Sequence, residues 1–479
     1  MSAISTSVDA ATFPSSEEIF GWIEYLSGLG HRKTGTPEGR ASADYIAAEL
    51  EKLGLEPTIE RAPTPCPSVT KQRFTVFGRE LPTFWANGTG RNAETGEFVS
   101  SVDGAEVVYL GHGWEVDFNG QDVAGKIVIC DIEFKPWTNA DILDRNPRGE
   151  AYDPDGSLNV EYNKYDIYSP HNWPFNYFRA QEAGAVGFIG ILQNYMDEIN
   201  YNEDYTENGH AIGVEWMSIP ALWTSRAAGA KLVEELSLED QDPEGSLHLT
   251  VDYELKDALN IHATLEGQSS EIILVHSHHD AVFAGAVQDA SGVSEVLAQA
   301  SYFTQLPLSE RPKSIMFAFT DTHFTDYIGH EAFIEARNRA EERIILDVCI
   351  EHIAKEIELG PDNEAIETGQ VEPRLVYITE ESGLYEDVKD AFARHGLGRT
   401  FFLPVHQRDT AAGGPYVFQS DEVISDAYAF ADAGIPVVSL VCGPMYLFHP
   451  SDTTARIAVD QLRPVGLAFA EIITTALKR

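Results

Sequence analysis

The chain has 479 residues, which is too long for one hydrophobic core, so we expect two or more domains. Acidic residues outnumber basic ones 76 to 33, and the formal charge of −43 argues against nucleic-acid binding because a phosphate backbone would be repelled. The four cysteines form no CxxC pair, which argues against a disulfide framework or a cysteine zinc site.

The sequence also carries no membrane or export signal. No window of about 18 or more apolar residues is present, so we expect no membrane span and no membrane partner. The start, MSAISTSVDAATFPSSEE, lacks the basic and apolar regions of a signal peptide. These features predict a cytoplasmic protein.

Residues 16–53 are predicted to be helical, with a polar turn in the middle. Apolar side chains recur at helical spacing from Ala43 to Leu53, and Gly54 supplies a stop signal. The intervening stretch HRKTGTPEGR is rich in turn-forming residues. We assign residues 1–85 to the N-terminal part of a first domain that continues beyond residue 250.

The character of the chain changes over residues 86–250. The runs AEVVYLG and GKIVICDIEF predict short strands, and a long polar stretch follows them. A helix, a tight turn and a strand are then predicted for FRAQEAGAVGFIGIL. A strand followed by a helix is predicted for IPALWTSRAAGAKLVEEL. This pattern predicts a separate α/β domain, residues 86–250, inserted into the first domain, and the main part of that first domain is residues 251–479.

Strands and helices alternate regularly beyond residue 255. Strand IILVHSHHD precedes helix SGVSEVLAQASYFTQL, strand KSIMFAF precedes helix GHEAFIEARNRAEERI, and VCIEHIA and GIPVVSLV are further strands. Such alternation is typical of an α/β fold with a mixed, mostly parallel sheet flanked by helices.

Potential metal ligands follow four of these strands. They are His278 with Asp280, His323, Glu351 and His449, and Asp289 lies just before a helix. Open α/β sheets place their sites outside the carboxyl ends of the strands, so these side chains are expected to converge. Imidazoles and carboxylates suit Zn²⁺, and also Fe²⁺, Mn²⁺ or Co²⁺. The sequence therefore predicts a metal site.

Five ordered motifs resemble the binuclear-zinc aminopeptidase family, which includes glutamate carboxypeptidase II, the transferrin receptor and glutaminyl cyclase. They are GHRKTGTPEGRASADYIAAELEKLGL, the HxD of His278–Asp280, GAVQDASGV, SDAYAFADAGIPVV and YLFHPSDT. The 86–250 segment resembles the protease-associated domain inserted in many members. The resemblance implies an aminopeptidase-like fold and one or two Zn²⁺ ions.

The resemblance also implies roles for individual residues. His278 would bind one metal, Asp280 would hold its other ring nitrogen, and Asp289 would bridge two metals. Glu351 stands where the family has an aspartate ligand, and His449 matches a ligand of the second metal.

Two neighbours of these residues are further candidates. His352 is the rival of Glu351, although adjacent strand residues point to opposite faces. Tyr446, in the same motif as His449, is assigned as a candidate substrate contact.

One family feature is replaced. The family has two adjacent glutamates, a general base and a metal ligand, at the positions of His323 and Phe324. His323 would then act as ligand or catalytic base, with Asp321 or Asp326 assisting, and imidazole is a competent base near neutral pH.

Three functions stay open for such a site. The first is hydrolysis of an amide or peptide-like bond in a short peptide-like or small substrate. The second is another metal-assisted reaction, such as elimination, cyclisation or lyase chemistry, on a small and anionic substrate. The third is a non-catalytic binding protein. We favour the hydrolase because four of the five metal positions keep a ligand type.

Overall fold

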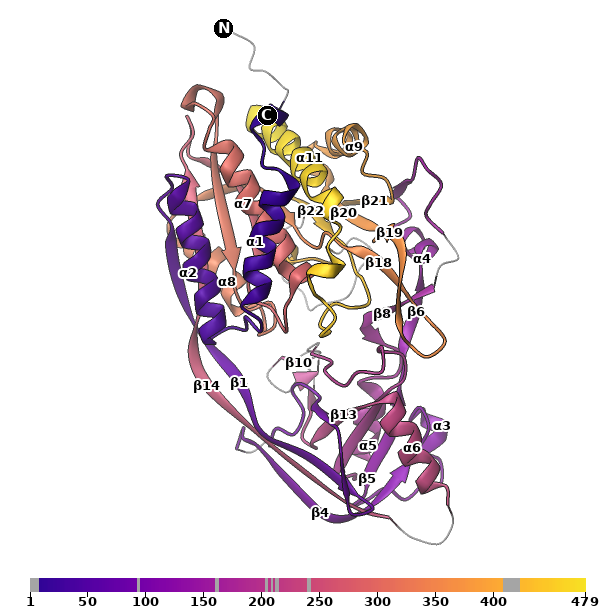
Figure 1. Ribbon diagram of the computed structural model, residues 1–479. Helices are drawn as coiled ribbons and strands as arrows, with labels where there is room; N and C mark the ends of the chain where they lie inside the picture. Colours follow the sequence, from indigo (N-terminus) through magenta and orange to yellow (C-terminus); the bar gives the residue numbers. More distant parts are fainter. Residues whose placement is uncertain are drawn as a thin grey trace.

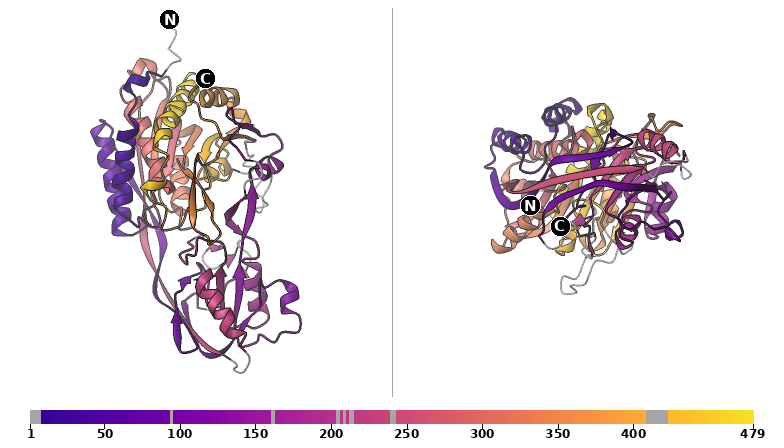
Figure 2. Two further views of the ribbon diagram at one scale, coloured as in Figure 1. Left: turned by 45° about the vertical axis from the view of Figure 1, so that its right-hand side comes forward. Right: turned by 90° about the horizontal axis from the view of Figure 1, so that it is seen from below.

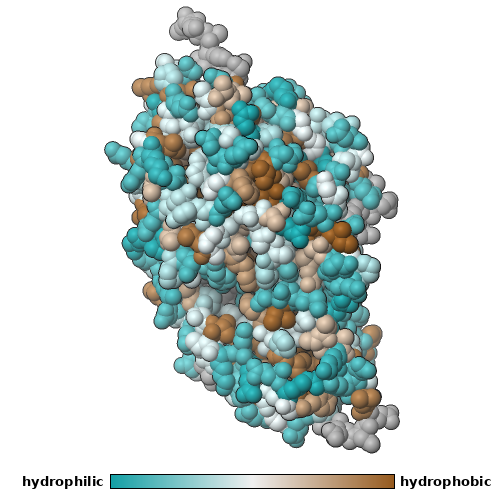
Figure 3. Space-filling model, in the orientation of Figure 1, coloured by the Kyte–Doolittle hydropathy of each residue, from teal (hydrophilic) through white to brown (hydrophobic). Residues whose placement is uncertain are grey.

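The computed structural model describes residues 8–92, 95–159, 163–202, 206–207, 210–211, 215–238, 243–407 and 423–479. The chain forms a larger lobe, which carries the N-terminal helices and the C-terminal half, and a smaller lobe formed mostly by the middle of the chain (Figure 1). Hydrophilic residues cover most of the face in Figure 3, as the excess of acidic residues leads one to expect.

The larger lobe is built on a mixed sheet, which confirms the predicted fold class. Its strands lie in the order β14 (Glu244–Leu265), β16 (Ser314–Thr320), β15 (Glu271–His278), β17 (Arg343–Ile350), β22 (Val437–Val441), β20 (Arg374–Thr379), β21 (Thr400–Val405) and β7 (Glu150–Tyr152). The central strands β16, β15, β17 and β22 are parallel to one another. Their carboxyl ends therefore meet at one edge.

Helices cover both faces of this sheet. They are α1 (Ser16–Gly28), α2 (Pro37–Lys52), α7 (Gly292–Phe303), α8 (Ile328–Arg339), α9 (Tyr385–Arg394), α10 (Tyr428–Asp432) and α11 (Val459–Lys478). Side chains alternate along β15, so Ile273 and Val275 enter one buried apolar cluster while Ile272 and Leu274 enter another on the opposite face. The predicted helical region 16–53 is the pair α1 and α2, separated by a turn.

The smaller lobe has its own parallel strands. β4 (Phe98–Tyr109), β5 (Ile127–Ile132), β9 (Gly187–Leu192) and β13 (Ala221–Ser225) are parallel neighbours, and β3 (Phe84–Trp85) pairs with β13 in the antiparallel sense. The helices of this lobe are α3 (Glu115–Phe118), α5 (Phe175–Glu182) and α6 (Arg226–Leu236). The apolar runs of β5 and β9 are buried on both sides.

Two connections join the lobes on opposite sides of the molecule (Figures 1 and 2). The first is the long antiparallel ribbon of β1 (Thr58–Val76) and β14, to which β2 (Arg79–Leu81) adds. The second is the ribbon of β6 (Phe134–Thr138) and β8 (Asn163–Pro170). It leads to α4 (Asn139–Arg145) and to β7, which pairs with β21 of the larger lobe.

The predicted boundary after residue 250 falls inside a continuous strand. Residue 250 lies within β14, whose pairing with β4 links the strands of both lobes into one hydrogen-bonded series. Residues 139–152 belong in space to the larger lobe, although they lie inside the segment 86–250. The amino-acid composition of the chain changes at the smaller lobe. The backbone hydrogen bonds between β14 and β4 do not depend on composition, so they continue across the predicted boundary.

The remaining short elements lie in the connections. They are the strands β10 (Thr206–Glu207), β11 (His210–Ala211), β12 (Glu215–Trp216), β18 (Lys355–Leu359) and β19 (Ala365–Val371), and the single turns η1 (Ala10–Thr12), η2 (Ala286–Ser291), η3 (Leu308–Glu310), η4 (Glu380–Ser382) and η6 (Thr454–Arg456). Within the described part of the chain, none of the helices has the length and apolar character needed to cross a bilayer.

Candidate metal centre

Three residues bring potential ligand atoms together at the carboxyl edge of the large sheet. They are His278 at the end of β15, His323 in the loop after β16, and Asp426 just before α10, with one atom from each within 4.8 Å of the others. The rings of His278 and His323 stack, with centroids 4.2 Å apart and an angle of 12° between their planes. The sequence predicted the two histidines, but not Asp426.

Asp426 is a buried carboxylate between two imidazoles. One of its oxygens lies 2.7 Å from Nδ1 of His323 and the other 3.3 Å from Nε2 of His330. Burial alone would raise the pKa of Asp426, but His278 and His323 hold this pKa well below its usual range. Because an ionised carboxylate only accepts hydrogen bonds, Nδ1 of His323 donates, and its Nε2 carries the lone pair.

Asp280 fixes the orientation of His278. Nδ1 of His278 lies 3.0 Å from the carbonyl oxygen of Asp280 and 3.3 Å from its carboxylate. Both are acceptors, so Nδ1 carries the proton and the lone pair is on Nε2, which is buried without a partner among the described residues. Asp280 also accepts from the backbone N–H groups of His323 and Phe324.

The ionisation of Asp280 supports this arrangement. Burial would raise its pKa, but the hydrogen bond from His278 is the largest of the interactions that oppose this, and the pKa is lowered to about 2. Asp280 is therefore an ionised carboxylate that orients the candidate ligand His278 and the loop that carries His323.

His323 is surrounded by polar groups. Its Nε2 lies 2.9 Å from the amide nitrogen of Gln288, and the Tyr327 hydroxyl lies 3.0 Å from its Nδ1. The carboxylate bonded to His323 is that of Asp426, and not that of Asp321, which accepts from the Thr34 hydroxyl and from the backbone N–H groups of Leu259 and Thr322. Asp321 thus holds the loop in place.

Asp289 and Glu351 lie outside the three-residue group. The Asp289 carboxylate accepts from the backbone of Gly292 and His352 and from the Ser277 hydroxyl, and burial and then Glu351 raise its pKa well above the usual range. Glu351 accepts from the Asp426 backbone and the Cys349 thiol, and burial and then Asp426 raise its pKa to about 8.

Gln288, directly before Asp289, is the residue of this segment that contacts His323. The backbone of Gln288 and Asp289 is not helical, so the alternation between adjacent side chains could not be read from the sequence. His352 was the rival of Glu351. Its Nδ1 donates to the Cys442 carbonyl at 2.6 Å, which leaves the lone pair on a buried Nε2 without a partner in the described structure.

His449 has the opposite tautomer. Its Nδ1 accepts from the Ser451 backbone N–H at 3.0 Å, and burial followed by Arg456 lowers its pKa to about 4. The neutral ring therefore carries its proton on Nε2, which is buried and finds no partner among the described residues. A protonated Nε2 is a hydrogen-bond donor rather than a metal ligand.

Phe324 lies beside the three-residue group. Its ring is 4.8 Å from the His323 ring, 6.2 Å from the His278 ring and 5.7 Å from the Phe448 ring. An apolar side chain therefore lies between the metal-ligand group and Phe448, the residue before His449.

The predicted substrate contact at Tyr446 is not supported by its position. The side chain is fully buried, and its hydroxyl donates to the Lys355 carbonyl at 2.7 Å. Tyr446 thus packs in the core and closes a loop. Its place in a motif gave no information on which way the side chain points.

Lone pairs on buried imidazole nitrogens and one ionised carboxylate suit a borderline divalent cation such as Zn²⁺. The Nε2 atoms of His278 and His352 have no partner in the described structure, and buried polar atoms normally have one. The residues present therefore fit a metal ion.

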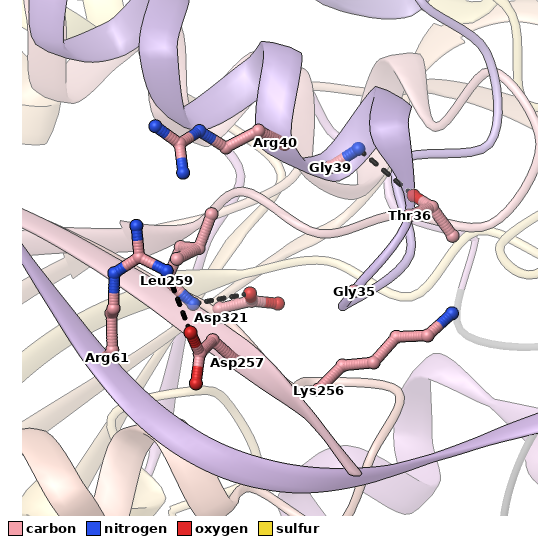
Figure 4. Close-up of a pocket in the computed structure, with 9 residues that line it drawn as sticks. All are labelled: Gly35, Thr36, Gly39, Arg40, Arg61, Lys256, Asp257, Leu259 and Asp321. Atoms are coloured by element: carbon pink, nitrogen blue, oxygen red, sulfur yellow. Dashed lines mark hydrogen bonds and ion pairs between the residues drawn. The ribbon is translucent and has the colours of Figure 1, made fainter. Parts of the chain in front are cut away.

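A cavity of about 310 Å³ is lined in part by Asp321, but it is not the metal site (Figure 4). Its wall includes Thr36 and Arg40 of the α2 region, Arg61 of β1, Lys256 of β14 and Asp321. None of the candidate metal ligands lines it. Figure 4 shows the ion pair between Arg61 and Asp257, which both line the cavity.

One family model matches part of this chain. Residues 260–473 match the model of peptidase family M28, and this range holds all three members of the group. No curated protein matches the chain.

Solved structures share the fold. The zinc aminopeptidase from Bacillus subtilis has a TM-score of 0.65 at 17% identity, covering 97% of this chain and 96% of its own. The peptidase M28 precursor of Shewanella amazonensis has a TM-score of 0.61 at 17% identity, covering 96% and 92%. The aminopeptidase from Aneurinibacillus sp. strain AM-1 has a TM-score of 0.58 at 17% identity, covering 98% and 95%.

Proposed function

We propose that the protein is a metal-dependent, peptidase-like hydrolase that cleaves an amide or peptide-like bond with an altered catalytic group, and the match of residues 260–473 to the model of peptidase family M28 supports this proposal. The observation that carries this proposal is the convergence of His278, His323 and Asp426 at the strand-end edge. Three protein ligands with an open position are typical of catalytic zinc sites.

The three residues would hold the ion through Nε2 of His278, a ring nitrogen of His323 and the Asp426 carboxylate. Zinc is the expected ion, and the same donor set also suits Fe²⁺, Mn²⁺ or Co²⁺. When bound, such an ion supplies a Lewis acid for the scissile carbonyl and lowers the pKa of water. Asp280 keeps the Nδ1 proton of His278 in place, so that the ligand lone pair faces the site.

Other residues bind and orient the substrate. His449 offers a buried Nε2–H that can donate to a carbonyl oxygen, and the Gln288 amide and Tyr327 hydroxyl border His323. Donors fixed in advance in a buried site stabilise negative charge that develops on the substrate oxygen. We therefore assign His449 to substrate binding in place of a second metal.

The charge of the site favours a second candidate function. Counting only the groups that would contact the ion, a divalent ion bound there would leave a net charge of about +1, because these groups include a single carboxylate and the ionised Asp280 lies behind His278. Such a site suits an anionic substrate and a non-hydrolytic reaction of the elimination, cyclisation or lyase type.

The test combines metal analysis with a substrate screen. We expect purified protein reconstituted with Zn²⁺ to hold about one ion per chain and to hydrolyse members of a panel of aminoacyl anilides and dipeptides. The second candidate function is tested by incubating the protein with a panel of anionic small molecules and identifying any products by mass spectrometry. His395→Ala is the control, since His395 pairs with Glu471 away from the site. A chain that binds no metal after reconstitution contradicts both candidates.

A further inference from the structure

The loop that carries His449 is held from outside the M28 domain. This loop, residues 442–452, connects β22 to the turn η6 and has no regular secondary structure. Strand β8 of the second connection reaches it at two points. The Lys164 ammonium donates to the Gly443 carbonyl at 3.3 Å, and the Tyr165 backbone N–H donates to the Met445 sulfur at 3.3 Å.

Lys164 is itself fixed by a buried ion pair. Its ammonium contacts the Glu372 carboxylate, and the two side chains are 11% and 1% exposed. Glu372 lies between β19 and β20 of the larger lobe. Removing one partner of a buried ion pair leaves the other charge buried and uncompensated, which is strongly destabilising. The ammonium is thus held where it can bind the Gly443 carbonyl.

The smaller lobe also touches His449 directly. Tyr195, in the segment after β9, places its ring 5.2 Å from the His449 ring at an angle of 80°. Behind Tyr195 lie the rings of Phe134, the first residue of β6, and of Tyr201, at 5.5 and 5.3 Å. An aromatic cluster of the smaller lobe therefore supports His449.

The far end of the same loop leads back to the metal-ligand group. The Asp452 carboxylate accepts from the backbone N–H groups of Val287 and Gln288 at 2.8 and 3.1 Å. Gln288 in turn contacts His323. A shift of the loop would therefore move His449 and disturb the segment that borders His323.

We propose that Lys164 and Tyr195 are positioning residues of the hydrolase, through which the β6–β8 ribbon and the smaller lobe hold the 442–452 loop and aim the Nε2–H of His449 at the substrate. This inference rests on the proposed role of His449 in the hydrolase. The lobe is then part of the active site, and not only a neighbouring domain. Loops open locally at low free-energy cost unless contacts hold them, which is why the loop depends on Lys164.

Another ion pair provides a matched control. Arg148 lies in the same chain segment between β6 and β8, donates to Glu380 and also donates to the Pro404 carbonyl, and both of these partners lie outside residues 442–452. Removing this charge tests the general loss of a bond between the segment and the larger lobe. Lys164→Arg keeps a charge that can reach Glu372 and is the conservative variant.

The experiment measures amide hydrogen exchange of the full chain with Lys164→Met, Lys164→Arg, Tyr195→Leu and Arg148→Met. We expect peptides within 442–452 to exchange about tenfold or more faster in Lys164→Met and Tyr195→Leu, with wild-type rates in Arg148→Met and near wild-type rates in Lys164→Arg. With an amide substrate, kcat should fall about tenfold in the first two variants while bound metal is retained.

Equal exchange of 442–452 in Lys164→Met and Arg148→Met would overturn the inference. If Lys164→Met does not fold, Tyr195→Leu decides by the same comparison. Failure of the proposed function is distinguishable, because wild-type protein would then cleave no amide substrate while the exchange data still decide whether the lobe holds the loop.

Discussion

Asp426 accepts a hydrogen bond from His323 at 2.7 Å, although the two residues lie 103 positions apart in the chain. The bond joins the loop after β16 to the segment before α10 at the carboxyl edge of the sheet. The resemblance to the binuclear-zinc aminopeptidases implies two adjacent glutamates at the positions of His323 and Phe324. At position 323 the structure has an imidazole that is paired with a distant carboxylate.

Removing His278 or Asp426 should remove the metal. We expect His278→Ala and Asp426→Ala to retain less than about a tenth of the wild-type metal content, because losing one ligand weakens metal binding by one to two orders of magnitude or more. His395→Ala should retain all of it. Elemental analysis of the purified variants checks this, and full metal retention by both site variants would exclude them as ligands.

His449→Ala should separate metal binding from catalysis. The Nδ1 of His449 accepts from the Ser451 backbone N–H, so we expect Nε2 to donate to the substrate instead of binding a metal. We expect unchanged metal content with kcat/KM lowered on the order of 100-fold, as for loss of one donor to a developing oxyanion. Elemental analysis and steady-state kinetics measure the two effects. Loss of metal in this variant would instead identify His449 as a ligand.

Restoring the glutamate pair should disable the native reaction. In the double variant His323→Glu, Phe324→Glu, the His323–Asp426 bond is replaced by two neighbouring carboxylates, which repel each other. The added negative charge should also reduce binding of an anionic substrate. We expect at least about a 100-fold loss of native turnover, with gain of weak aminopeptidase activity. Turnover close to that of the wild type argues against a role for His323.

Tyr446→Phe should affect stability but not substrate binding. The Tyr446 hydroxyl is bonded to the Lys355 carbonyl in the core, so its loss should lower the free energy of unfolding by about 1 kcal/mol. KM should stay at the wild-type value. Denaturant unfolding and steady-state kinetics measure these quantities, and a severalfold rise in KM at wild-type stability would place Tyr446 in the substrate site after all.

Glu295 should make the protein less stable as the pH rises. Both of its carboxylate oxygens are buried in α7 without a partner in the described structure, and burial raises its pKa well above the usual range. The folded state therefore binds a proton more tightly than the unfolded state. The destabilisation is absent below the unfolded pKa and grows by about 1.4 kcal/mol per pH unit until the pH passes the folded pKa.

Glu295→Gln should remove this dependence. We expect its advantage in unfolding free energy over the wild type to grow from pH 5 to pH 8, as measured by denaturant titration at each pH. The exposed Glu24→Gln serves as control. An advantage that does not change with pH would mean that Glu295 is ionised in the folded protein.

Much of the architecture could be predicted because the spacing of apolar residues in the sequence corresponds to the strands and helices of the fold. The apolar run of β15 and the helical spacing from Ala43 to Leu53 reappear as elements, and the strand-end position of His278 and His323 brings them together. Strand direction alone determines this convergence. The limits of the inserted segment were less predictable, since β14 crosses residue 250 without a break.

Side-chain direction in irregular backbone could not be read from the sequence. Asp289 and Gln288 are adjacent, and only local backbone angles decide that Gln288 contacts His323 while Asp289 accepts backbone hydrogen bonds. Asp426 lies in SDAYAFADAGIPVV, which supported the family resemblance. Its position within a shared motif could have marked Asp426 as a candidate, but the sequence does not show that its partner is His323 in a distant loop.

Anomalous diffraction at the zinc edge from crystals of the Zn²⁺-loaded protein tests the central claim most directly. The account predicts one strong peak per chain, within about 2.0–2.3 Å of ligand atoms of His278, His323 and Asp426 and with no density bonded to His449. A peak bound by Asp289, Glu351 and His449, with His323 more than about 6 Å away, would contradict it.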